Sequence, residues 1–118
     1  MKVFREFRFE AAHRLPDAPE GHKCRRLHGH SYRLVVHVAG TIQPATGWVI
    51  DYADIRKAVD PLIQQLDHQY LNEIEGLGKP TAEVITQWLW RRLKPTLPGL
   101  TKLDLYETVQ CGCSYEGE

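Results

Sequence analysis

The segment His22-Lys23-Cys24-Arg25-Arg26-Leu27-His28-Gly29-His30 places a thiol four residues before a His-Gly-His pair. The alternating run from His28 to Gly40 is typical of a strand. Side chains two residues apart on a strand leave the same face, with Cα atoms about 6.6 Å apart. His28 and His30 can therefore reach a single metal ion, although such a pair is weak evidence until a third histidine joins it.

The N-terminal segment supplies the third histidine. Apolar and charged residues alternate from Val3 to His13, which predicts a strand that ends with His13 on its more apolar face. A loop over residues 14–27 connects the two strands, and loops of that length in small domains are usually functional. Because the end of one antiparallel strand lies about 4.8 Å from the start of the next, we expect His13 beside His28 and His30.

Three neutral imidazoles at one end of a sheet are typical of a catalytic zinc site, in which a fourth position stays open. The alternative is a group of three partly buried, hydrogen-bonded histidines. Two further histidines are not expected to be ligands, since His22 is a loop residue near the site and His37 faces away from it.

Two helices are predicted in the middle of the chain. Asp51 is a candidate N-cap for the first, whose apolar positions repeat every three to four residues from Ile55 to Leu66. Pro61 lies inside this stripe and should kink or divide the helix. Thr81 can cap the second helix, which should stop before Pro95.

Alternation returns from Leu100 to Val109, and a last extended segment covers Cys113 to Tyr115, whereas residues 67–80 are expected to be irregular. The element order is therefore strand, strand, helix, helix, strand, strand (ββααββ). This order predicts an α+β fold in which two helices cover one face of a four-stranded antiparallel sheet. Residues 1–118 are expected to form a single domain.

The composition narrows the class of protein. Fifteen basic and fifteen acidic residues cancel, which argues against a protein that binds nucleic acid or a membrane through its charge. No apolar segment reaches the roughly 18–20 residues of a membrane span. The N-terminus has no apolar signal core and the cysteine count of three is odd, so we expect a cytoplasmic protein with reduced thiols.

Cys24 is the candidate reactive group. A thiol acts as a base or nucleophile in its thiolate form, which nearby cations or a metal ion favour. Lys23, Arg25 and Arg26 are such cations. The alternatives are a free surface cysteine and a solvated basic loop; the more useful role for the cations is to hold a phosphorylated substrate.

Two acidic positions are further candidates. Asp67 precedes His68, and a carboxylate can fix the tautomer of an imidazole so that it shuttles protons, although such a pair can also be structural. Glu107 lies on the apolar face of its predicted strand, where a carboxylate is costly unless paired. It can accept hydrogen bonds from the 2-amino group and ring N–H of a pterin or purine, or pair with a buried arginine.

Short motifs along nearly the whole chain carry a family resemblance. They are Phe9-Glu10-Ala11-Ala12-His13, Cys24-x3-His28-Gly29-His30, Thr46-Gly47-Trp48-Val49-Ile50-Asp51, Leu66-Asp67-His68-Gln69-Tyr70-Leu71-Asn72, Pro80-Thr81-Ala82-Glu83 and Tyr106-Glu107-Thr108. In this order they resemble the 6-pyruvoyltetrahydropterin synthase family, in particular its bacterial branch, which forms 6-carboxy-5,6,7,8-tetrahydropterin in the queuosine pathway.

The resemblance implies the tunnelling fold (T-fold), in which three subunits close into a β-barrel and two trimers stack as a homohexamer. It implies Zn²⁺ bound by His13, His28 and His30. The implied substrate is 7,8-dihydroneopterin triphosphate, which loses triphosphate and acetaldehyde to leave a 6-carboxy group.

The resemblance also implies catalytic and binding roles for five residues. Cys24 would remove a carbon-bound proton, and His68 with Asp67 would relay protons. Glu107 would anchor the pterin, together with Thr108 in the same motif.

Two other functions remain open, a 6-pyruvoyltetrahydropterin synthase and a non-catalytic zinc-binding module. The module needs neither an activated thiol nor a buried acid, so Cys24 and Glu107 argue against it, as they do against a simple zinc hydrolase. Three residues separate Cys24 from His28, a spacing that resembles the carboxy-forming branch, because the pyruvoyl-forming branch tends to carry a longer insert.

Overall fold

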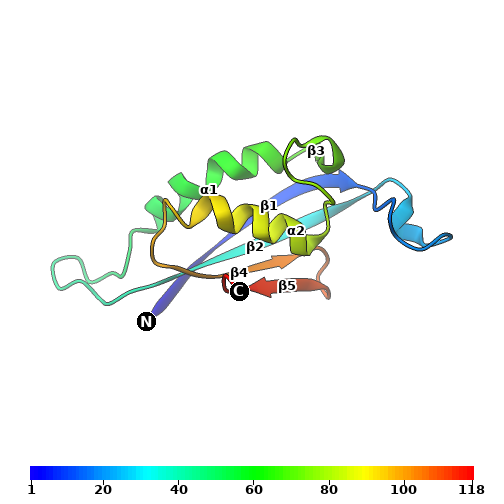
Figure 1. Cartoon of the computed structure of the whole chain (residues 1–118). Coiled ribbons are helices and arrows are strands. Elements are labelled where there is room, and N and C mark those ends of the chain that lie inside the picture. The colour runs from blue at the N-terminus through cyan, green and yellow to red at the C-terminus, as the bar shows by residue number, and fades with distance from the viewer.

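Two long strands form the centre of the fold. The computed structural model describes residues 1–118, and in it β1 (Lys2–His13) pairs antiparallel with β2 (His28–Ala39) along its whole length (Figure 1). Their alternating sequences place one row of side chains in the core and the next on the opposite face. The two predicted N-terminal strands are confirmed.

Three shorter strands complete a five-stranded sheet with the order β3-β1-β2-β4-β5. β4 (Leu100–Tyr106) pairs antiparallel with β2, and β5 (Gly112–Tyr115) pairs antiparallel with β4. β3 (Gln69–Tyr70) pairs parallel with β1, so the predicted four-stranded, wholly antiparallel sheet is wrong in this respect. Residues 67–80, expected to be irregular, also contain a short 3₁₀ helix, η2 (Leu71–Glu73). A two-residue strand is too short for a period-two pattern to reveal it.

The first helix, α1 (Tyr52–Leu66), begins as predicted after Asp51, whose side chain accepts a backbone N–H of the first turn at 2.9 Å. Pro61 was predicted to kink or divide the helix; it lies inside one continuous helix, so the division is wrong. A proline in a helix interior costs about 3 kcal/mol. The neighbouring Val59 and Leu62 are buried, and each contributes about 1.5–3 kcal/mol by burial. Packing onto the sheet therefore keeps the helix continuous.

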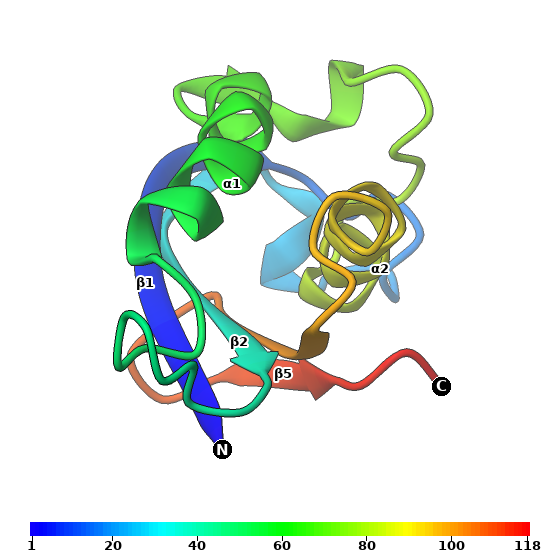
Figure 2. The same cartoon turned by 90° about the vertical axis from the view of Figure 1, so that its left-hand side faces the viewer.

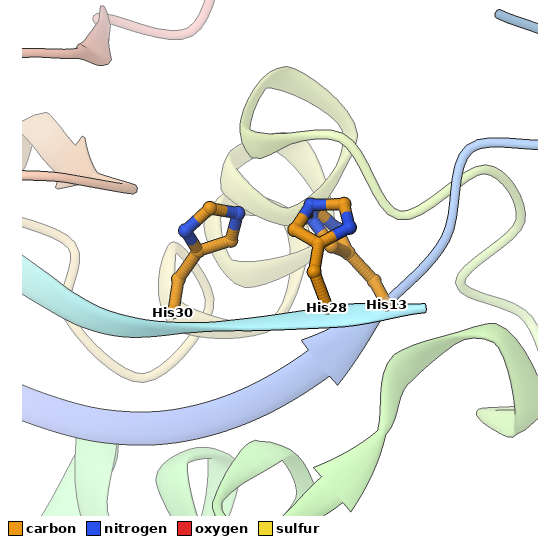
Figure 3. A group of neighbouring side chains, drawn as sticks. All are labelled: His13, His28 and His30. Carbon is orange, nitrogen blue, oxygen red and sulfur yellow. Dashed lines mark hydrogen bonds between the residues drawn. The ribbon is translucent and has the colours of Figure 1, made fainter. Parts of the chain in front are cut away.

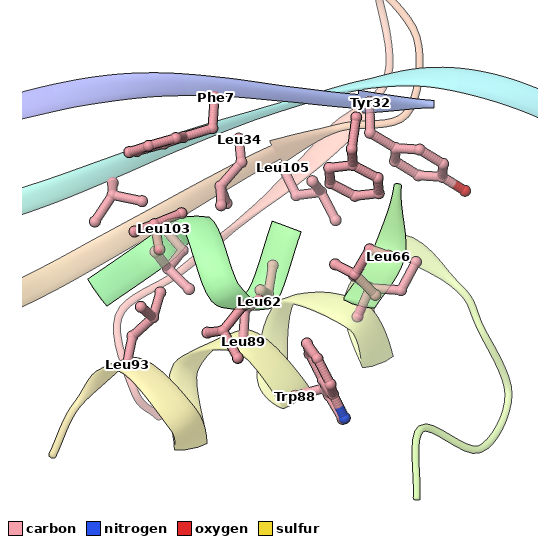
Figure 4. Packing of buried hydrophobic residues seen from close by; sticks show 14 of the residues in the cluster. Phe7, Tyr32, Leu34, Leu62, Leu66, Trp88, Leu89, Leu93, Leu103 and Leu105 are labelled. Carbon is pink, nitrogen blue, oxygen red and sulfur yellow. The ribbon is translucent and has the colours of Figure 1, made fainter. Parts of the chain in front are cut away.

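The second helix, α2 (Ala82–Leu93), is capped by Thr81, whose hydroxyl oxygen accepts the N–H of Val84 at 3.2 Å. Both helices lie on the same side of the sheet, as predicted (Figure 2). Helices and sheet enclose a core of 22 buried residues, to which α2 contributes Trp88 and Leu89 (Figure 4). No helix in the structure has the length and hydropathy needed to cross a membrane.

Candidate metal centre and active site

Three histidine side chains meet where β1 ends and β2 begins. In the strand register His13 lies opposite His28, and Ala11 lies opposite His30. All three rings project from the same face of the sheet (Figure 3). Their ligand atoms lie within 4.8 Å of one another, with His13 fully buried and the other two partly buried. The predicted grouping of the three histidines is confirmed.

Backbone carbonyls set the tautomers of two rings. His13 Nδ1 lies 2.7 Å from the Pro80 oxygen, and His28 Nδ1 lies 2.7 Å from the Arg26 oxygen. A carbonyl oxygen only accepts, so each Nδ1 donates a hydrogen, and in the neutral ring Nε2 then carries the free lone pair. The two Nε2 atoms lie 3.0 Å apart. Lone pairs at this distance repel, and a shared cation removes the repulsion, since two nitrogens in a tetrahedral zinc shell lie about 3.3 Å apart.

The third ring, His30, has a buried Nε2 with no hydrogen-bond partner, and Glu107 Oε1 lies 3.4 Å from it. Burial lowers the pKa of His30; the Glu107 carboxylate opposes this, and positive charge on His13 or His28 adds to it. The ring is therefore held in the neutral form that binds metals. A buried polar atom normally has a partner, and three neutral imidazole nitrogens fit a Zn²⁺ ion with one open position.

Cys24 lies in a short 3₁₀ helix, η1 (Lys23–Arg25), within the loop between the two strands. The residue is partly buried, and its thiol lies outside the group of converging ligand atoms. Two hydrogen bonds fasten the loop to the strand ends. The Cys24 carbonyl accepts the N–H of Leu15 at 2.7 Å, and the Arg26 carbonyl accepts the His28 ring N–H. The cations of this segment are exposed and can meet an anionic ligand.

The structure places Asp67 and His68 at the edge of the sheet, beside β3. Asp67 Oδ1 accepts the N–H of Glu10 at 2.8 Å and lies 3.0 Å from His68 Nδ1. These hydrogen bonds, that from Glu10 first, hold the pKa of Asp67 below its usual range. His68 has a left-handed backbone (φ 58°) and a side chain that is 78% exposed. Within one chain the pair forms no hydrogen bond or ion pair with Cys24 or Glu107.

A surface hollow of about 520 Å³ lies beside His68, on the face of the sheet opposite the three histidine rings. His68 and His30 both line it, as do Glu10 and Ser31. The Ser31 hydroxyl donates to Glu10 Oε2 at 2.6 Å, which fixes one wall. Ser31 and Glu10 project away from the three histidine rings, so within one chain the sheet separates this hollow from the candidate metal ligands.

Glu107 follows β4 and lines a small cavity of about 140 Å³ next to the first residues of α2. Its one ion-pair neighbour is His30 and no arginine pairs with it, so the alternative of a buried arginine is wrong. Thr108 organises the adjacent turn, because its hydroxyl oxygen accepts the N–H of Cys111 at 3.0 Å. The Glu107 N–H donates to the Cys111 carbonyl at 2.9 Å. The Glu107 carboxylate therefore lies next to a turn that the Thr108 hydroxyl stabilises.

Two features of the site were not predicted from the sequence. The buried Tyr32 hydroxyl lies 3.4 Å from His13 Nδ1. Burial, followed by the nearby Glu107 carboxylate, raises the pKa of Tyr32, so the hydroxyl keeps its proton. The position of Tyr32 two residues after His30 on an alternating strand was a signal for it. The contact of the Pro80 carbonyl with His13 could not be predicted, because every residue has a backbone oxygen whatever its type.

Comparisons with known proteins find relatives over nearly the whole chain. A sequence model of the 6-pyruvoyl tetrahydropterin synthase family matches residues 2–118. The 6-carboxy-5,6,7,8-tetrahydropterin synthase of Synechocystis sp. is 44% identical, over 96% of this chain and 91% of the relative. The dihydroneopterin monophosphate aldolase of Pyrococcus furiosus is 37% identical, over 92% and 90% respectively. The structure of Caenorhabditis elegans 6-pyruvoyl tetrahydropterin synthase superposes with a TM-score of 0.91 at 26% identity, covering 100% of this chain and 96% of that one.

Proposed function

The chain belongs to the 6-pyruvoyl tetrahydropterin synthase family of pterin enzymes, and we propose that it converts 7,8-dihydroneopterin triphosphate to 6-carboxy-5,6,7,8-tetrahydropterin, releasing acetaldehyde and triphosphate, in queuosine biosynthesis. The observation that carries the proposal is the 3.4 Å approach of Glu107 Oε1 to His30 Nε2. It places a carboxylate suited to a pterin directly beside a centre of three histidines. The relative from Synechocystis sp. that bears this activity in its name supports the same reaction.

His13, His28 and His30 would hold Zn²⁺ through their ring nitrogens. When bound, the ion would act as a Lewis acid towards the hydroxyl groups of the substrate side chain. The chain supports this role by fixing two tautomers through the Pro80 and Arg26 carbonyls. Ligands oriented in advance need little reorganisation when the ion or the substrate arrives.

Glu107 would anchor the pterin ring. A carboxylate can accept two parallel hydrogen bonds from the 2-amino group and the ring N–H of the pterin, which sets the plane and direction of the ring. Because Glu107 borders His30, a pterin held in this way directs its side chain towards the metal centre. The hydrogen bond between the Thr108 hydroxyl and the Cys111 N–H limits the motion of the backbone that carries Glu107.

Cys24 would be the base that removes a carbon-bound proton from the substrate side chain. The hydrogen bond to Leu15 keeps its backbone next to the end of β1, where His13 stands. Lys23 and Arg26 are exposed cations that can meet the triphosphate, whereas the Arg25 guanidinium already donates to the Ala18 carbonyl at 3.0 Å. The spacing of three residues between Cys24 and His28 supports the carboxy-forming branch.

His68, oriented by Asp67, would relay protons. Its side chain is 78% exposed at the sheet edge, so a neighbouring subunit can approach it. The edges formed by β3 and β5 are unpaired in the single chain, and closure into a ring removes such edges. We therefore include in the proposal a homo-oligomer built from trimeric β-barrels, most simply a hexamer.

A second candidate is 6-pyruvoyltetrahydropterin synthase activity, which the structural likeness to the Caenorhabditis elegans enzyme favours. Both reactions release triphosphate, and only the carboxy-forming reaction releases acetaldehyde. Incubation of the purified protein with 7,8-dihydroneopterin triphosphate should therefore release acetaldehyde and triphosphate in equal amounts. Triphosphate without acetaldehyde would favour the second candidate, and release of neither would contradict both.

A further inference from the structure

His22 makes three hydrogen bonds within the loop that carries Cys24. Its backbone N–H donates to the Pro19 carbonyl at 2.9 Å, and its carbonyl accepts the N–H of Arg25 at 3.1 Å. Its ring Nδ1 accepts the N–H of Cys24 at 3.0 Å. The residue is otherwise exposed. The one hydrogen bond that the His22 ring makes is therefore with the backbone of Cys24.

The backbone of Cys24 is consequently held on both sides. The His22 ring takes its N–H, and its carbonyl accepts the N–H of Leu15 at 2.7 Å. Leu15 lies two residues after His13, so this second hydrogen bond holds the Cys24 backbone close to a candidate metal ligand. With both backbone groups fixed, the direction of the Cα–Cβ bond, and with it the reach of the thiol, is also fixed.

We propose that His22 is a positioning residue for Cys24: its ring caps η1 and sets the direction of the thiol relative to the three-histidine centre. The inference rests on the proposed role of Cys24 as the base. Asparagine is the conservative replacement, because its side-chain oxygen accepts the N–H two residues further along, whereas alanine removes the acceptor.

The test measures alkylation of Cys24 and turnover in the same preparations of purified protein. His22→Ala should raise the rate of iodoacetamide alkylation at Cys24, mapped by mass spectrometry, about fivefold, because a cap of this kind restrains the turn by roughly that factor. The same variant should lower kcat about fivefold to tenfold, because the thiol is less often aimed at the substrate. Faster alkylation with slower turnover is the signature of lost positioning.

Two control variants complete the design. His22→Asn should return both rates to within about twofold of the unsubstituted protein, because it restores the acceptor. Glu20→Ala removes an exposed side chain from the same loop and should change neither rate.

An unchanged alkylation rate in His22→Ala would overturn the proposal, and so would a His22→Asn variant as impaired as His22→Ala. The alkylation rate does not depend on which pterin the protein uses. It therefore decides the role of His22 even if the turnover assay contradicts the proposed reaction.

Discussion

His37 Nε2 lies 2.7 Å from Asp104 Oδ2 on the face of the sheet opposite the three-histidine centre. His37 and His30 belong to the same strand, β2, but they are seven positions apart, an odd spacing that makes them project to opposite faces. One strand thus carries a histidine fixed by a carboxylate and another whose buried nitrogen has no partner. The two residues form a matched pair for a test of metal binding.

His30→Ala should lower bound zinc well below one ion per subunit, because it removes one of the three converging ligands. His37→Ala removes a histidine of the same strand on the other face and should leave the zinc content unchanged. Elemental analysis of the purified variants measures both. Equal zinc content in the two variants would show that His30 is not a zinc ligand.

Asp104→Asn should lower the free energy of unfolding at neutral pH. Burial alone would raise the pKa of this carboxyl, but hydrogen bonds from Ser114, His37 and Lys102 outweigh it and hold the pKa below its usual range. A carboxylate with a lowered folded pKa stabilises the protein above the unfolded value of about 3.9, and this contribution is lost as the pH falls through the folded pKa. We expect a loss of about 1–3 kcal/mol at about pH 7 that shrinks below about pH 4.

Chemical denaturation of the metal-free protein at neutral and acidic pH measures this effect without interference from metal release. Asp54→Asn is the control, because Asp54 is exposed and its partner Lys57 lies 4.0 Å away. That substitution should cost no more than about 0.5 kcal/mol. A cost of Asp104→Asn that is equal at both pH values would contradict the assigned hydrogen bonds.

Cys24→Ala should keep the fold and the zinc content and lose nearly all turnover, because general base catalysis is typically worth about 10²–10⁴-fold. Cys113→Ala is the control, since that thiol contacts Thr86 at 3.2 Å and packs against the core, and it should retain activity. Steady-state kinetics compares the two. A Cys24→Ala variant with more than about a tenth of the original rate is incompatible with a role as the base.

Glu107→Gln should weaken pterin binding by about 1.5–3 kcal/mol, as expected when a charged hydrogen-bond acceptor becomes neutral. Glu73→Gln makes the same change at an exposed position of η2 and should not alter the affinity. Titration calorimetry with a pterin ligand gives both values. Unchanged affinity in Glu107→Gln would make Glu107 a structural acid.

The metal centre could be predicted from the sequence because it depends on two local rules. Period-two alternation puts His28 and His30 on one face, and the antiparallel register of neighbouring strands brings His13 opposite His28. The caps at Asp51 and Thr81 follow equally local rules and lie where they were expected.

Other features depend on contacts between distant parts of the chain. The parallel pairing of β3 with β1 follows the left-handed backbone of His68, a conformation that most histidines do not adopt and that the residue type alone does not predict. The continuity of α1 through Pro61 depends on packing against the sheet. The cap that His22 provides for Cys24 is visible only as a hydrogen bond.

Mass spectrometry of the pterin formed from 7,8-dihydroneopterin triphosphate tests the proposed function most directly. Zinc binding and a reactive cysteine are expected of both branches, so the product is the property that separates them. We expect 6-carboxy-5,6,7,8-tetrahydropterin as the principal product, formed together with acetaldehyde. A product that is chiefly 6-pyruvoyltetrahydropterin, with no acetaldehyde, would contradict it.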